Sequence, residues 1–185
     1  MNPLPQINAL DVAILAALAA GLFAGWSLGV IRQLLGLAAF YVALVFGAQL
    51  HPWVSGWIRS IGSQADWVLV DAMSFVAIFL VVLLAFNWAG FRVYKDTRVP
   101  ILKALDNVLG GILGVFSAIL FLVIGLAVLR FAFSVPWQEW DGLRLEVTRL
   151  YTDSTLEKLF YGFTPTLYLL IRPWLPGGLP AIFSF

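Results

Sequence analysis

Cysteine is absent from the 185 residues of this chain, and histidine occurs only once, at His51. Without cysteine the chain forms no disulfide, no thiolate metal site and no cysteine nucleophile. A single histidine argues against catalytic triads and against metal centres built on several histidines. We therefore expect no catalytic residue, no metal site and no cofactor, and a function other than that of an enzyme.

Charged residues are also scarce, at 11% of the chain, compared with about 25% in ordinary soluble domains. The formal net charge is +1, and no basic stretch is dense enough to bind nucleic acid. Apolar residues dominate instead: 62% of the chain is hydrophobic and the mean hydropathy is +0.95. A soluble fold of this composition would expose large apolar patches, so the composition indicates a protein solvated by a lipid bilayer.

Four apolar stretches are long enough, or nearly so, to cross a bilayer as helices, which takes about 20 residues. They cover residues 12–31, 34–50, 67–91 and 105–129. A single helix over the first two would be about twice as long as the hydrocarbon layer is thick. The chain must therefore turn between Gly25 and Gln33 and form a tight hairpin. We predict an all-α membrane protein with about four transmembrane helices.

Residues 51–66 separate the second and third apolar stretches and contain Pro52, two glycines and two tryptophans. Proline and glycine interrupt helices, and tryptophan prefers the level of the lipid headgroups. This composition predicts a short amphipathic segment on the membrane surface, in which His51 is a solvated loop residue.

Charged and apolar residues alternate after residue 140. Apolar residues recur at helical spacing over 143–151, and Ser154 followed by Glu157 is typical of a capped helix start. We predict two amphipathic helices that lie on the membrane or pack on the bundle. The chain would thus consist of a four-span membrane domain over residues 1–140 and an amphipathic, interfacial C-terminal segment over residues 141–185.

Lysine and arginine gather in the loop over residues 92–103 and at Arg32 in the first turn. Both places lie on the same side of a four-span protein, and such residues favour the cytoplasmic side. We therefore expect both termini to lie outside the cytoplasm.

Glycines four residues apart form stripes on the first and fourth spans, at Gly21, Gly25, Gly29, Gly110 and Gly114. Small residues at this spacing let two helices approach closely. We favour packing of the first span on the fourth within one chain. An interface between copies of the chain is the alternative.

Three aspartates, Asp11, Asp71 and Asp106, each lie in the first turn of a predicted span. A carboxylate there caps free N–H groups and complements the helix dipole. Acids at membrane depth can also mark an ion or proton route, for which Asp106 is the best candidate. Because Asp106 shares a predicted boundary with Arg32, we predict an ion pair between them. The other polar residues within the spans are expected to hydrogen-bond to backbone or to a neighbouring helix: Asn87 and Ser117.

Residues 10–47 and 102–129 together resemble the colicin V production (CvpA-type) family of small bacterial inner-membrane proteins. The pattern of that family opens with an aspartate, continues into a glycine-rich hairpin with an arginine, and closes with an aspartate and two glycines. The positions that match it in this chain are Asp11, Gly29, Arg32, Asp106, Gly110 and Gly114.

The chain departs from the family pattern mostly at charged positions. Leu28 and Asn107 each stand where the pattern has arginine, and Gln33 stands where it has glutamate. Ser117 and Ala118 stand where the pattern has a last Arg-Gly pair. These departures remove charges near or within the membrane and leave the hairpin and the helix packing plausible.

The resemblance implies an accessory protein of the bacterial inner membrane that is needed for production or secretion of a colicin V-type toxin and for envelope homeostasis. Its partners would be the lipid bilayer and either further copies of the chain, as a homo-oligomer, or another membrane protein. The alternative is a small channel or transporter that works as an oligomer. That alternative requires polar residues that face a common cavity.

Overall fold

The computed structural model describes residues 7–61, 67–93, 103–134 and 141–174. Within these ranges the chain is helical and contains no strand. Four helices are long and apolar enough to cross a membrane: α1 (Ala9–Leu28), α2 (Val30–Ser60), α3 (Trp67–Val93) and α4 (Lys103–Ser134). The prediction of an all-α protein with four membrane helices is therefore confirmed. Lys95 and Arg98 of the predicted cytoplasmic loop lie outside the described residues.

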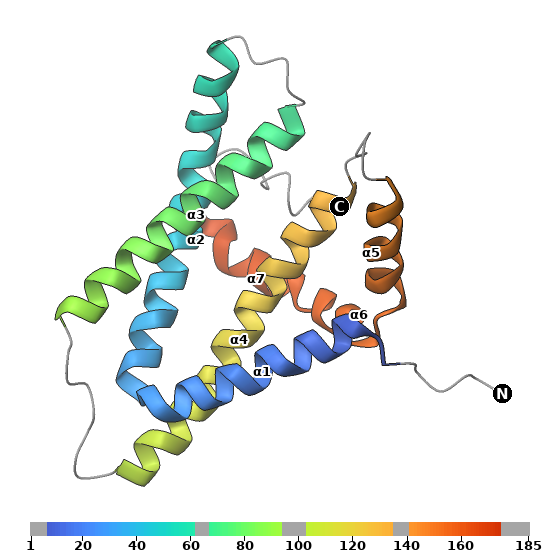
Figure 1. Ribbon diagram of the computed structural model, residues 1–185. Coiled ribbons are helices and arrows are strands. Elements are labelled where there is room, and N and C mark those ends of the chain that lie inside the picture. Colours follow the sequence, from blue (N-terminus) through green and yellow to red (C-terminus); the bar gives the residue numbers. More distant parts are fainter. Residues whose placement is uncertain (1–6, 62–66, 94–102, 135–140, 175–185) are drawn as a thin grey trace.

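The four long helices pack as two pairs (Figure 1). α1 lies along α4 and α2 lies along α3, while α2 also contacts α4 and so joins the pairs. From the turn that connects them, α1 and α2 diverge. The predicted hairpin is consequently tight only at its tip, because each of its arms packs mainly on a different partner.

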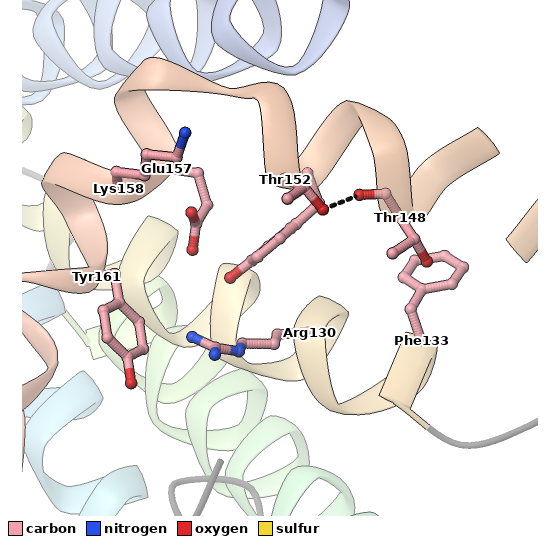
Figure 2. A pocket seen from close by; sticks show the side chains of 8 residues that line it. Arg130, Phe133, Thr148, Thr152, Glu157, Lys158 and Tyr161 are labelled. Atoms are coloured by element: carbon pink, nitrogen blue, oxygen red, sulfur yellow. Dashed lines mark hydrogen bonds between the residues drawn. The ribbon is translucent and has the colours of Figure 1, made fainter. Parts of the chain in front are cut away.

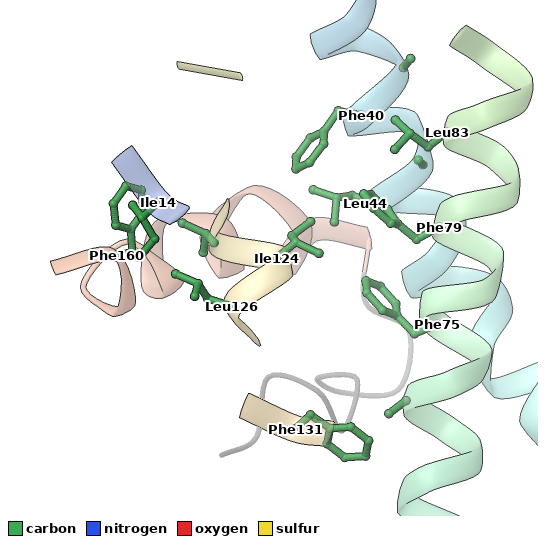
Figure 3. Close-up of a cluster of buried hydrophobic side chains, with 14 residues drawn as sticks. Ile14, Phe40, Leu44, Phe75, Phe79, Leu83, Ile124, Leu126, Phe131 and Phe160 are labelled. Atoms are coloured by element: carbon green, nitrogen blue, oxygen red, sulfur yellow. The ribbon is translucent and has the colours of Figure 1, made fainter. Parts of the chain in front are cut away.

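The apolar core centres on α2, whose Phe40 packs against both α3 and α4, and it extends to Ile14 of α1 and to Phe160 of a shorter helix that follows α4 (Figure 3). The Phe40 ring meets Phe79 of α3 and Phe121 of α4 edge to face, with centroid distances of 5.6 and 4.9 Å. Such aromatic pairs contribute about 1 kcal/mol each beyond the burial of their area. Large apolar side chains such as Phe23 and Leu84 point outward instead, as a bilayer-solvated surface requires.

α2 continues through residues that the sequence predicted to leave the membrane. It ends only at Ser60 and contains Pro52 in its interior. Proline lacks the N–H that would bond four residues back, which costs about 3 kcal/mol in a helix interior. The predicted break at His51 is wrong, because packing of α2 along α3 outweighs this local cost.

Shorter helices follow α4: α5 (Asp141–Asp153), α6 (Thr155–Tyr161) and α7 (Thr164–Ile171), the last continued by a 3-10 turn over Arg172–Trp174. Ser154 caps α6, since its Oγ accepts a hydrogen bond from the Glu157 N–H at 3.0 Å. Both α5 and α6 contact α4 and the start of α1, whereas α7 contacts α2. The last part of the predicted C-terminal segment, residues 175–185, lies outside the described residues.

Candidate functional site

The seam between α1 and α4 brings the glycine stripes of the sequence together. A Cβ atom on Gly110 would lie 2.5 Å from the carbonyl oxygen of Gly25, and one on Gly21 would lie 2.6 Å from the Ala118 Cβ. Cβ atoms on Gly25 and Gly114 would collide with the carbonyl oxygens of Gly110 and Gly21, respectively. The two backbones are thus in contact, and this glycine seam is occupied within a single chain.

Gly29 forms the elbow between α1 and α2, with a φ of 78°. This left-handed value favours glycine because other residues carry a Cβ that clashes there. Gly29 has no side chain that could cap α2. Instead, Oδ1 of the buried Asp106, from the start of α4, accepts a hydrogen bond from the Val30 N–H at 2.9 Å.

Asp106 therefore caps a helix other than its own. A Cβ atom on Gly29 would meet its carboxylate, so the elbow has room for this cap only because residue 29 is glycine. The sequence expected Asp106 to cap α4 and to pair with Arg32. In the structure the Asp106 carboxylate caps the start of α2 through the Val30 N–H. The ion pair with Arg32 stays a prediction.

Two positions at which the chain departs from the family pattern meet each other. Ser117 Oγ on α4 lies 3.3 Å from Oε1 of the buried Gln33 on α2 and 2.9 Å from the Leu113 carbonyl oxygen. A neutral hydrogen bond thus links the positions where the pattern has a glutamate and an arginine. Asn87 donates to the Leu83 carbonyl of its own helix at 2.9 Å, which confirms the expectation of a backbone partner.

Asp11 serves two helices at once, and we call it and its partners the Asp11 anchor. Asp11 and Asn8 form a reciprocal capping box at the start of α1, with both hydrogen bonds at 3.0 Å. The other carboxylate oxygen accepts from Ser154 Oγ at 2.6 Å and from the Leu156 N–H at 2.9 Å. The carboxylate is 2% exposed and ties the start of α6 to the start of α1. The sequence predicted the first role and missed the second.

A polar cluster of His51, Ser55 and Asp71 lies between α2 and α3. His51 Nε2 is 3.6 Å from Asp71 Oδ2, and Ser55 Oγ donates to Asp71 Oδ1 at 3.3 Å. The prediction of a solvated loop histidine is wrong, because His51 is only 5% exposed within the continuing α2. The four-residue spacing of His51 and Ser55, which places both on one helix face, was the available signal.

The contacts of this cluster join α2 to α3. Ser55 hydrogen-bonds to the aspartate and His51 lies beside it, whereas nucleophilic catalysis needs the serine hydroxyl bonded to the histidine. The second ring nitrogen of His51 lies 3.1 Å from the Gly47 carbonyl oxygen. The cluster therefore satisfies polar groups inside an apolar helix pair.

A cavity of about 490 Å³ lies between the last turns of α4 and the pair α5 and α6 (Figure 2). We call it the Arg130 cavity. Three of its lining side chains are charged, four carry hydroxyls and one is apolar: Arg130, Glu157, Lys158, Thr148, Tyr151, Thr152, Tyr161 and Phe133. Sequence reasoning did not group these residues as a site, because they come from three elements that only the fold brings together.

Tyr151 links the charges of the Arg130 cavity. Its side chain hydrogen-bonds to Glu157 and to Arg130. Burial, and then the hydrogen bond and the charge of Glu157, raise the pKa of Tyr151 well above its usual range, while Arg130 opposes this shift. The Arg130 guanidinium lies over the Tyr161 ring, 4.5 Å from its centroid.

The model of a known protein family matches most of this chain. No curated protein and no solved structure matches the chain. The model of the family described as Colicin V production protein matches residues 10–156. This range contains all of α1 except Ala9, the whole of α2 to α5, and the chain as far as Leu156. It therefore includes Asp11 and both groups at the start of α6 that its carboxylate binds, the Ser154 hydroxyl and the Leu156 N–H. The chain therefore belongs to the Colicin V production protein family.

Proposed function

We propose that this chain is an accessory protein of the bacterial inner membrane that supports the production or secretion of a colicin V-type toxin and envelope homeostasis. The observation that carries the proposal is the family match over residues 10–156, which takes in all four apolar helices. In this role the chain acts through contacts with protein or lipid.

The Asp11 anchor supports such a role, because it fixes a polar unit at one end of the membrane helices. α5 and α6 are held against α1 and α4 there. α5 also exposes side chains of both charges, including Glu146, Arg149 and Asp153, beside a second cavity of about 340 Å³. A charged surface held rigidly at the membrane is what an accessory protein needs to contact a partner.

A toxin-release assay tests the proposal in a colicin V-producing strain that lacks its own family member. We expect expression of this chain to restore toxin in the culture medium, measured as a growth-inhibition zone on sensitive cells. Asp11→Asn removes the charge that holds α6 and should abolish restoration at an unchanged membrane level of the protein. Asp153→Asn, at an exposed acid of α5, is the matched control and should restore release. An inactive wild-type chain at the same level would contradict the proposal.

The alternative function is that of a small oligomeric channel or transporter, which needs polar groups that face a common cavity. The polar residues of the spans are engaged at separate places. Asp71 bonds within the α2–α3 pair, Asp106 bonds at the elbow, and Asn87 bonds to its own helix. This arrangement favours the accessory role.

A further inference from the structure

The Arg130 cavity lies where a membrane helix ends. Arg130 and Phe133 belong to the last turns of α4, whose apolar span extends over Ala104–Phe133. The other lining residues belong to α5 and α6, outside the four spans. Lipid headgroups lie at this depth, where the hydrocarbon gives way to water. One wall of the cavity thus comes from the membrane span and the rest from helices at its end.

Positive charge exceeds negative charge in the lining of the cavity, with Arg130 and Lys158 against Glu157. Glu157 is buried, accepts a hydrogen bond from Tyr151 and lies in the first turn of α6. Its charge is therefore partly compensated inside the protein. Lys158 is exposed, and an arginine has five N–H donors, of which the contact with Tyr151 occupies only part.

The guanidinium of Arg130 is held in place by two aromatic side chains. Tyr151 hydrogen-bonds to it, and the face of the Tyr161 ring lies 4.5 Å from it. Figure 2 shows Arg130, Tyr161 and Glu157 directed into the same space. A fixed, planar guanidinium loses little entropy when it binds a phosphate through two parallel hydrogen bonds.

We propose that the Arg130 cavity binds the phosphate headgroup of an anionic phospholipid. Arg130 contacts the phosphate oxygens, and the Phe133 ring contacts the glycerol backbone and the first acyl carbons. The exposed side chain of Lys158, whose nitrogen is directed away from Arg130 in Figure 2, turns to reach the same phosphate when the lipid binds. A volume of about 490 Å³ is that of a small-ligand site. The site does not depend on the role in toxin release, so failure in either assay leaves the other proposal standing.

Lipid titration of the purified full chain in a neutral detergent, followed by native mass spectrometry, tests this site. The probes are dioctanoyl phosphatidylglycerol and, as the net-neutral comparison, dioctanoyl phosphatidylcholine. We expect saturable binding of the anionic lipid, at least about tenfold tighter than that of the neutral lipid. Arg130→Gln and Lys158→Gln should each weaken it about tenfold, since each removes a charge-assisted hydrogen bond.

Arg149→Gln is the matched control, because Arg149 is exposed on α5 and lines a different cavity. It should bind the anionic lipid as the wild type does. Equal binding by all variants, or an equal loss in Arg149→Gln, would assign the effect to surface charge and overturn the proposal.

Glycerol phosphate and inorganic phosphate separate a lipid from a soluble ligand. If either bound as tightly as the anionic lipid and with the same dependence on Arg130, the site would belong to a soluble phosphate. That result would overturn the lipid assignment. If Arg130→Gln failed to fold, as judged by circular dichroism, the exposed Lys158→Gln substitution would still decide the outcome.

Discussion

Three aspartates of this chain are bound to specific partners within an apolar protein. Asp11 holds α6, Asp106 caps α2, and Asp71 ties α3 to α2. An unpaired charge in such surroundings is costly, so each carboxylate is placed against donors that the fold supplies. The side chain of Tyr151 likewise interacts with both Glu157 and Arg130.

The raised pKa of Tyr151 predicts how stability depends on alkaline pH. The folded chain holds the phenolic proton more tightly than the unfolded chain, in which tyrosine titrates near about pH 10. The stabilisation from Tyr151 is therefore complete below that pH and is lost as the pH rises above it. We expect the thermal midpoint to fall above about pH 10, and to fall less in Tyr151→Phe.

The measurement is thermal unfolding in detergent between about pH 8 and pH 11. Tyr41→Phe, at an exposed tyrosine of α2, controls for the loss of a phenol elsewhere and should follow the wild type. If Tyr151→Phe lost as much stability as the wild type over this range, the proton on Tyr151 would not be linked to folding.

Pairing of the helices depends on backbone contact at the glycine seam. α1 carries no charged residue beyond Asp11, so its attachment to α4 comes from close packing. Membrane helices gain little from the hydrophobic effect against each other, because lipid is equally apolar. Contact between Gly21, Gly25, Gly110 and Gly114 supplies the van der Waals attraction instead.

Gly25→Leu should therefore separate α1 from α4. The side chain would collide with the Gly110 backbone, and overpacking of this kind costs about 1–3 kcal/mol or more. We expect a lower thermal midpoint at every protein concentration. Gly36→Leu on α2, where a Cβ meets nothing within 4 Å, is the matched control and should leave the midpoint unchanged. A midpoint that fell only upon dilution would place Gly25 at an interface between copies.

At the scale of the whole molecule, the elbow and the start of α4 lie at one end of the membrane helices. The Asp11 anchor and the Arg130 cavity lie at the other end (Figure 1). Each end thus has its own polar contacts, and the two ends face opposite sides of a membrane. We propose that the end with the elbow is cytoplasmic, on the basis of Arg32 and the arginines and lysines over residues 92–103.

Cysteine labelling tests this orientation, and the absence of native cysteine leaves no background. Gly142→Cys introduces a thiol on α5 where a Cβ meets nothing within 4 Å, and Ala104→Cys introduces one at the exposed start of α4. In cells with a permeabilised outer membrane, a membrane-impermeant maleimide should label Gly142→Cys. It should reach Ala104→Cys only after lysis. The reverse pattern would invert the orientation.

The sequence by itself determined the membrane class, the four spans, the site of the turn and the Ser154 cap. Each of these depends on composition, on the length of apolar runs, or on residues a few positions apart. The run of glycines and the family pattern at Asp11, Gly29 and Asp106 also indicated where contacts form.

Only the tertiary structure decided which helices pair and what the buried polar groups bind. Asp106 meets Val30 across a sequence separation of 76, and Asp11 meets Ser154 across 143. Local patterns carry no information about such partners, since these depend on how whole helices pack. For the same reason the continuation of α2 past Pro52 and the Arg130 cavity became evident only in the fold: packing along α3 outweighs a local helix breaker, and three separate elements build one cavity.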